Sequence, residues 1–318
     1  MIRTRALTRH FRTRSGTVEA VRGIDLDVAD GEVVAVLGPN GAGKSTTLRM
    51  LTTLLPPTSG SAQVAGHDVG HDAVAVRRRI GLVGQGHGSS PGLRVHEELT
   101  AQARLHGLGR RDARSRAAET ARMLDLDGLG DRDTGTLSGG QLRRLDVAMG
   151  LVHRPPVVFL DEPSTGLDPQ SRANLWGHIR RLRDDLGTTV VLTTHYLDEA
   201  DGVADRVVVI DHGEIIADGT PEQLKSKVSG DLVTVELADA AQADQARRVA
   251  AALPGAHEIE TDAGTLRFRV PGGDTVTPQV VRLLDEAGVS LRGTQVNRPS
   301  LDDVFLTLTG RSLRESAA

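Results

Sequence analysis

The feature that most constrains the fold of this chain is an apolar run, VVAVL at residues 33–37, that leads directly into GPNGAGKS at 38–45 and then into helix-forming residues. This is the pattern G-x-x-x-x-G-K-S between a strand and a helix. Glycines allow successive backbone N–H groups to curl around a phosphate, and the N-terminus of the following helix adds its positive end. We therefore expect a phosphate-binding loop at the C-terminal end of a buried strand.

Each polar residue of this loop has an expected role. Lys44 should reach the β- and γ-phosphate oxygens of a nucleotide, Ser45 should ligate Mg²⁺, and Thr46 should donate a further hydrogen bond to phosphate. The rest of the expected nucleotide-binding loop consists of Gly38, Pro39, Asn40, Gly41, Ala42 and Gly43.

A second apolar strand ends in two adjacent carboxylates, in VVFLDE at residues 157–162. Carboxylates often cap strands without any further role, but a phosphate loop elsewhere in the chain changes what the pair can do. A hydrolase needs one carboxylate near the metal and a base for the attacking water. Asp161 is the expected magnesium partner and Glu162 the expected base.

Two further polar residues follow apolar runs. Gln85 comes after IGLVG, where its neutral amide could contact the metal or the attacking water and also respond to a neighbouring surface. His195 comes after TTVVLTT, at the end of a strand, where ligands gather in open α/β sheets. We expect both to act at the site, whereas His87, His153 and His178 are expected to be structural or exposed.

Composition narrows the class of protein. The 318 residues suffice for two domains, and an interior with 38% hydrophobic but 2% aromatic residues suits buried parallel strands of Val, Leu, Ile and Ala. The chain has no cysteine, which excludes disulfides and thiolate metal sites. A net charge of -4 argues against nucleic acid as a partner, and the arginines of the first 14 residues are expected on a solvated strand face. No apolar run reaches the length of a membrane helix, so we expect a cytoplasmic protein.

The order of the motifs resembles the nucleotide-binding subunit of ABC transporters: GPNGAGKST, Gln85, LSGGQ, VVFLDEP, STGLDP and LTTH, over roughly residues 1–226. The resemblance implies an α/β fold of the P-loop NTPase class, an ATP-binding domain over residues 1–228 and a helical subdomain at about 86–136. It places Phe11 where an aromatic ring stacks on adenine, Asp168 in a loop that touches an opposite protomer, and His195 at the γ-phosphate. Phe11 departs from the more usual tyrosine, but stacking needs only a ring face.

The segment LSGGQ lies far along the chain from Lys44, after an insert whose apolar periodicity is typical of packed helices. A serine and two glycines at a helix start would allow a phosphate to approach the backbone closely. The family resemblance implies that this phosphate belongs to the ATP of a second copy of the chain. We therefore expect a head-to-tail homodimer that encloses two ATP molecules, each contacted from the opposite protomer by Ser138, Gly139, Gly140 and Gln141.

The resemblance also favours one branch of the family. A single phosphate loop without a long coiled-coil insert favours transport over translation or DNA repair. The runs LTTHYLDEADGVADRVVVIDHGEIIADGTPEQLKS and RPSLDDVFLTLTG are similar to those of daunorubicin-resistance ATPases, which serve ABC-2 exporters. This implies an ATPase on the inner face of the cell membrane that powers export of a hydrophobic compound, such as an antibiotic, through a separate ABC-2 permease docked where the Gln85 loop meets the helical insert. Export of a lipid or polysaccharide, and a soluble regulatory or resistance ATPase without a membrane partner, are the alternatives.

Residues 229–310 contain no nucleotide motif but have a strand–helix pattern of their own. Strands are expected at 232–237, 257–261, 265–270 and 289–296, helices near 242–252 and 277–287, and a capping helix in SLDDVFLTL. The order β-α-β-β-α-β predicts a small ferredoxin-like α+β domain without a catalytic role. Residues 311–318 are expected to form a flexible tail. The expected apolar stripe of the capping helix, buried within the protein, consists of Leu301, Val304, Phe305 and Leu308.

Overall fold

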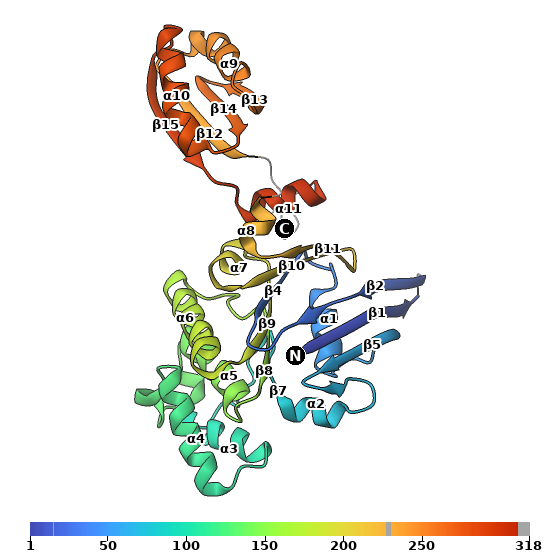
Figure 1. The fold of residues 1–318 in the computed structure, drawn as a ribbon. Helices are drawn as coiled ribbons and strands as arrows, with labels where there is room; N and C mark the ends of the chain where they lie inside the picture. Colours follow the sequence, from blue (N-terminus) through green and yellow to red (C-terminus); the bar gives the residue numbers. More distant parts are fainter. Residues whose placement is uncertain (15, 227–229, 311–318) are drawn as a thin grey trace. The chain divides into compact units, whose positions relative to one another are not determined.

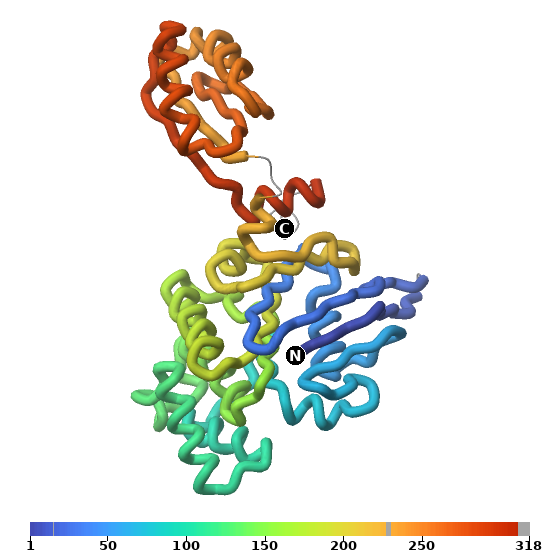
Figure 2. The backbone as a smooth tube through the Cα atoms, in the orientation of Figure 1, coloured from blue at the N-terminus to red at the C-terminus, as the bar shows by residue number. Residues whose placement is uncertain are grey.

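A computed structural model describes residues 1–14, 16–226 and 230–310 (Figure 1). The chain forms two compact units, of which one spans Met1–Pro221 and the other begins at Glu222. Figure 2 traces the backbone of both. The expected domain boundary after Val228 and the expected tail at 311–318 lie outside the described residues.

The first unit is organised around a six-stranded sheet with the order β11-β10-β4-β9-β8-β7. Its neighbouring strands are parallel except for the antiparallel pair β10 and β11. The central strands β4, β8 and β9 are buried along their whole length and mainly apolar, as is typical of strands that are covered on both faces. The strands are β4 (Val33–Leu37), β7 (Ile80–Val83), β8 (Val157–Asp161), β9 (Thr189–Thr194), β10 (Arg206–Asp211) and β11 (Glu214–Gly219).

A second, antiparallel sheet of the same unit has the order β2-β1-β5-β6, with β3 paired to β1. Arg3 and Arg5 of β1 are exposed and bond to Asp27, in agreement with a solvated strand face. The core of the unit is shared by both sheets and α1, and includes Leu7 and Met50. The strands are β1 (Ile2–Thr13), β2 (Gly16–Ile24), β3 (Asp27–Val28), β5 (Ser59–Val64) and β6 (His67–Asp68).

Helices lie against the central sheet and extend beyond it (Figure 1). Two of them, α3 (Val95–Leu105) and α4 (Arg110–Met123), fall within the segment expected to be a helical subdomain, and they pack on each other and on α5. In the described part of the chain, no helix combines the length and the apolar character needed to cross a membrane. The other helices of this unit are α1 (Lys44–Leu51), α2 (Ala73–Arg79), α5 (Gly139–Leu151), α6 (Pro169–Leu186) and α7 (Leu197–Val203), with short 3-10 turns η1 (Asp127–Leu129) and η2 (Thr134–Thr136).

The second unit has the predicted order of strands and helices. Its four strands form an antiparallel sheet with the order β13-β14-β12-β15, which confirms the ferredoxin-like arrangement. Apolar residues of this sheet and of the helices α9 and α10 form a separate core around Phe268. The elements are β12 (Asp231–Leu237), η3 (Ala240–Gln242), α9 (Ala243–Ala251), β13 (His257–Asp262), β14 (Thr265–Val270), α10 (Gly273–Glu286), β15 (Leu291–Asn297) and α11 (Leu301–Thr309). Along the chain they are preceded by α8 (Pro221–Lys225), whose first residue is counted with the first unit.

The capping helix α11 agrees with its expected stripe in three of four positions. Leu301, Val304 and Phe305 are buried, the last of them 1% exposed. Leu308 is 41% exposed, so its predicted burial is wrong. It lies in the last turn of α11, which ends where Gly310 takes up a left-handed conformation.

Two histidine rings stack where α3 ends and the loop after α5 begins. The ring centroids of His106 and His153 are 3.5 Å apart and the rings are nearly parallel. Nε2 of His153 lies 3.0 Å from the carbonyl oxygen of Ile80. Burial, together with the neighbouring His106, lowers the pKa of His153 from 6.5 to about 4, so the pair is neutral at pH 7.

This pair predicts a loss of stability in mild acid. Between pH 6.5 and pH 4 the unfolded chain protonates His153 and the folded chain does not, so the free energy of unfolding must fall as the pH falls through this window. We expect His153→Phe to reduce that loss by about 1–2 kcal/mol at pH 5, allowing for partial solvent screening. Urea unfolding at pH 7 and pH 5 measures the difference. His67→Phe, in β6, is the control, and an unchanged pH dependence in His153→Phe would contradict the assignment.

Candidate functional site

The phosphate loop lies between β4 and α1, as predicted. It consists of residues 38–43, and α1 begins at Lys44. Its first residue has to be glycine: Gly38 has a φ of 153°, and a Cβ atom there would lie 2.1 Å from the carbonyl oxygen of Ile210. The loop therefore leads the backbone from the end of a buried strand to a helix N-terminus, where N–H groups are free to bind an anion.

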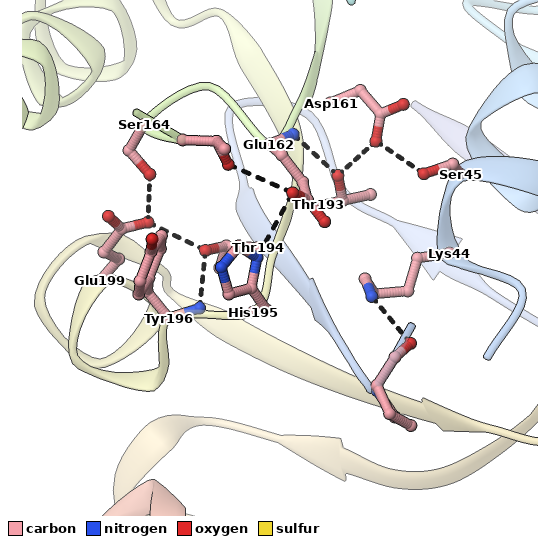
Figure 3. A network of polar contacts seen from close by, with 12 residues as sticks. Lys44, Ser45, Asp161, Glu162, Ser164, Thr193, Thr194, His195, Tyr196 and Glu199 are labelled. Carbon is pink, nitrogen blue, oxygen red and sulfur yellow. Dashed lines mark hydrogen bonds and ion pairs between the residues drawn. The ribbon is translucent and has the colours of Figure 1, made fainter. Parts of the chain in front are cut away.

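Lys44 is buried, and the loop itself holds its ammonium group (Figure 3). Nζ donates to the carbonyl oxygen of Gly38 at 2.6 Å and to that of Pro39 at 3.0 Å. Burial lowers the pKa of Lys44, and the nearby carboxylates of Glu162 and Asp161 partly offset this effect. A buried cation that is held by neutral carbonyls is well placed to attract a phosphate.

Ser45 and Asp161 meet at the C-terminal edge of the central sheet (Figure 3). Ser45 Oγ donates to Asp161 Oδ1 at 3.0 Å, and Thr193 Oγ1 donates to the same oxygen at 2.6 Å. Hydroxyl and carboxylate oxygens are ligands that Mg²⁺ prefers, so these residues fit the expected metal. The described residues contain no group of three His, Asp or Glu side chains that could hold an ion, so phosphate and water would supply the remaining ligands. Thr46 follows Ser45 in α1 and is half-buried.

Glu162 follows Asp161 with a strained backbone. Its φ of 47° lies in the left-handed region, which costs on the order of 1–3 kcal/mol for a residue with a side chain. Its N–H group is held by the Thr193 carbonyl and hydroxyl oxygens, at 3.1 and 3.0 Å. Its Oε2 lies 3.3 Å from Nδ1 of His195 and 3.2 Å from the hydroxyl of Thr165. The structure therefore brings together the expected base and the expected strand-end histidine.

A buried carboxylate supports this arrangement, and the sequence did not point to it. Glu199 Oε2 accepts hydrogen bonds from the hydroxyls of Ser164 at 2.7 Å and Thr194 at 2.9 Å (Figure 3). Burial raises the pKa of Glu199. Thr193 was missed in the same way, although two threonines directly before His195 at a strand end were a usable signal.

The LSGGQ segment lies beside the start of α6. Ser138 caps α5, and its hydroxyl accepts from the N–H of Gln141 at 3.3 Å. Gly139 is exposed, and a Cβ atom on Gly140 would lie 2.4 Å from the hydroxyl of Ser171.

Ser171 is in turn bound by the cap of α6. Asp168 accepts hydrogen bonds from its N–H group at 2.9 Å and from its hydroxyl at 2.6 Å. α6 buries Trp176 on the side facing the core. The exposed serine and glycine of the LSGGQ segment and the exposed Asp168 thus lie on neighbouring helix starts.

Two expected site residues lie away from these contacts. Gln85 is exposed in the loop that follows β7. Phe11 is half-buried on β1, opposite Val18 of β2, and the Arg9 guanidinium lies 4.7 Å from the centre of its ring. A cavity of about 440 Å³ opens between β2 and the phosphate loop, lined by Thr17, Val18, Glu19, Ala20, Arg22, Gly41 and His212.

Comparisons with known proteins agree with this geometry. The family model of ABC transporters matches residues 21–165, and that of the ATP-binding protein DrrA1-3-like C-terminal domain matches residues 219–309. Daunorubicin resistance ATP-binding protein DrrA3 of Streptomyces coeruleorubidus is 46% identical over 96% of this chain and 96% of its own length. Nod factor export ATP-binding protein I of Burkholderia thailandensis is 38% identical, with 93% of each chain covered.

A solved structure is similar to the first unit. The dimeric, post-hydrolysis structure of the ATP-binding cassette MJ0796, bound to ADP and Pi, superposes with a TM-score of 0.64 and 26% identity, covering 69% of this chain and 98% of that one. The predicted P-loop NTPase fold is thereby confirmed.

The position of Lys44 predicts a binding defect when it is removed. Lys44→Ala should raise the Kd for ATP about 10- to 100-fold, because a charge-assisted hydrogen bond contributes about 1.5–3 kcal/mol. Titration with a fluorescent ATP analogue measures the change. Arg49→Ala removes an exposed cation from the same helix and should leave the Kd unchanged. Equal affinities for Lys44→Ala and the unaltered chain would show that Lys44 does not contact phosphate.

Proposed function

The chain belongs to the ATP-binding subunits of ABC transporters, in the branch of the daunorubicin/doxorubicin resistance proteins, and we propose that it hydrolyses ATP to power export of a hydrophobic compound through a separate ABC-2 permease. The observation that carries the proposal is the convergence of Lys44, the Ser45–Asp161 pair and the Glu162–His195 pair at one edge of the central sheet. This edge holds the groups that phosphoryl transfer to water requires.

Each group has a proposed role. Mg²⁺, held by Ser45 and Asp161 and approached by Gln85, would neutralise charge on the phosphates. Lys44 binds the β- and γ-phosphates. Glu162 accepts the proton of the attacking water, and His195 contacts the γ-phosphate and orients the Glu162 carboxylate.

The base and ribose of ATP are assigned to the cavity beside the phosphate loop. The cavity reaches Gly41 of that loop, so a nucleotide whose phosphates bind at Lys44 can extend into it. Val18, which lines the cavity, lies opposite Phe11 in the strand register, and side chains of an opposed pair share one face of a sheet. This supports Phe11 as the ring that stacks on adenine.

A homodimer completes the site in this proposal. Ser138, Gly139, Gly140 and Gln141 act on the ATP of the opposite protomer, and Asp168 lines the same contact. Their support is the adjacency of the two exposed helix starts, of α5 and α6, together with the dimeric state of the similar ATP-binding cassette.

The cargo and the membrane partner are inferred from the relatives. The relative named for daunorubicin resistance is more similar to this chain than the relative named for Nod factor export. This difference favours a drug-like cargo over a Nod factor. We assign the second unit to assembly with the permease or the partner protomer, since the sequence of its described residues 230–310 contains no second phosphate loop.

Removal of the base should separate binding from hydrolysis. Glu162→Gln keeps the shape of the side chain but not its basicity, so ATP should still bind while kcat falls by about 10²- to 10⁴-fold. Phosphate release and ATP titration measure the two quantities, with Glu214→Gln, exposed on β11, as the control. Near-normal turnover in Glu162→Gln would remove Glu162 from the mechanism.

The same variant tests transport. In membrane vesicles that contain the chain together with a candidate ABC-2 permease, the unaltered chain should drive ATP-dependent uptake of an anthracycline and Glu162→Gln should not. ATP hydrolysis without membrane association or uptake would instead support a soluble ATPase.

The dimer predicts that two inactive chains can restore one site. Ser138→Arg blocks the surface offered to the opposite ATP, and Lys44→Ala disables the chain's own phosphate loop. A mixture of the two should regain part of the ATPase activity, because one of the two composite sites then has both intact halves. The specific ATPase activity of the unaltered chain, per amount of protein, should rise with protein concentration. Failure of the mixture, with a constant specific activity, would contradict a shared site.

A further inference from the structure

Arg143, in the second turn of α5, is a buried cation that the motifs and the proposed roles leave unexplained. It is 3% exposed. A guanidinium presents five N–H donors in a rigid planar fork, which suits several acceptors at once. It donates to four backbone carbonyl oxygens: from Nε to Pro163 at 2.7 Å, from Nη1 to Gly84 at 2.7 Å, and from Nη2 to Glu162 at 3.3 Å and Asp161 at 3.4 Å.

These carbonyls belong to the two segments that the proposed mechanism needs to act together. Three of them surround the base at the end of β8, and Gly84 directly precedes Gln85. α5 also lies close against β7, which leads into the Gln85 loop, since a Cβ atom on Gly81 would be 2.2 Å from the carbonyl oxygen of Gly150. The helix that carries Ser138 at its start is therefore bound to both segments.

A second residue of α5 holds the far side of the Gln85 loop. Asp146 accepts from the N–H of Gly88 at 2.9 Å, and its other oxygen lies 2.7 Å from Nδ1 of His87. It also lies 3.9 Å from Arg143. The Gln85 loop is thus bound before and after Gln85 by two charged residues one turn apart on the same helix.

The backbone of Glu162 shows what these contacts have to maintain. A left-handed conformation persists in a residue with a side chain only where the surroundings hold it. Thr193 binds the N–H group of Glu162, and Arg143 binds its carbonyl group. Both backbone polar groups of Glu162 are therefore held by hydrogen bonds, the N–H group from β9 and the carbonyl group from α5.

We propose that Arg143 is a positioning residue for hydrolysis: it holds the Glu162 backbone in its strained conformation and ties it to the Gln85 loop and to the helix that begins at Ser138. Arg143 does not touch ATP. It acts through Glu162, so this inference rests on the proposed function. A displacement of the Gln85 loop by a docked partner would be transmitted through the Arg143 fork to the base.

The test is a double-mutant cycle with a matched control. Arg143→Gln should lower kcat about 10- to 100-fold, the loss expected when a catalytic group is displaced, with the KM and Kd for ATP nearly unchanged. In the Glu162→Gln background the same change should lower kcat little further, because its effect passes through Glu162. Arg144→Gln is the control, since the next residue of α5 is also bound to carbonyl oxygens, those of Leu124 and Asp125, but none of them belongs to the site.

A conservative variant keeps the test decisive if Arg143→Gln does not fold. Arg143→Lys retains the buried positive charge but cannot reach all four carbonyls, so it should still fold, with a single cooperative thermal transition, and still lose kcat. Normal kcat in Arg143→Lys, or a full additional loss of kcat from Arg143→Gln in the Glu162→Gln background, would overturn the proposal. Near-normal turnover in Glu162→Gln alone would instead remove the base from the proposed function, which is a separate result.

Discussion

The geometry of the site depends on the register of three buried parallel strands, β4, β9 and β8. Leu37 lies opposite Thr194, and Asp161 lies opposite Thr193, so the residues that follow three apolar runs emerge at one edge of the sheet. Because side chains alternate between the faces of a strand, a shift of one residue between β8 and β9 would turn Asp161 away from Thr193. A shift between β4 and β9 would displace the phosphate loop, and Ser45 with it, relative to Asp161. Every residue of the three strands is buried, so a shifted strand would carry the polar residues that follow it into the sheet and move apolar residues out of it.

The parts of the site that the sequence predicted are those encoded by adjacent residues. The phosphate loop and the Asp161–Glu162 pair each lie within a few residues of an apolar run. One short segment therefore predicts both the strand and the functional residues that follow it. The contacts that join separate segments depend on which elements lie side by side, and nothing local marks most of them. Glu199 with Ser164 and Thr194, and Arg143 with the carbonyls that follow β8, were therefore not predictable. Thr193 differs, because its place directly before the strand-end residues Thr194 and His195 was a usable signal for its contact with Asp161. The fold of the second unit was also predictable, because the alternation of a strand and the periodicity of a helix are each contained within one segment. A boundary was less predictable: α10 begins at Gly273, four residues before the expected Thr277.

Two buried cations of the first unit use backbone carbonyl oxygens in different ways. Lys44 is bound by two carbonyls of its own loop, from which a phosphate could draw it at a modest cost, because its compact ammonium rotates freely on a long stem. Arg143 is bound by four carbonyls from separate segments, which no single ligand replaces. In the proposed function, a lysine thus serves where the partner has to change during turnover, and an arginine where it has to remain.

The burial of Trp176 in α6 gives the protein an optical reporter. It is the only tryptophan among the 318 residues, and the same helix begins at the Asp168 cap against which the LSGGQ segment packs. Indole emission shifts with the polarity around the ring, so the ultraviolet fluorescence of the unlabelled chain comes from a single, known position. A change in solvent access around α6 would alter its wavelength without any attached dye, and a chain of otherwise few aromatic residues adds little background to that signal.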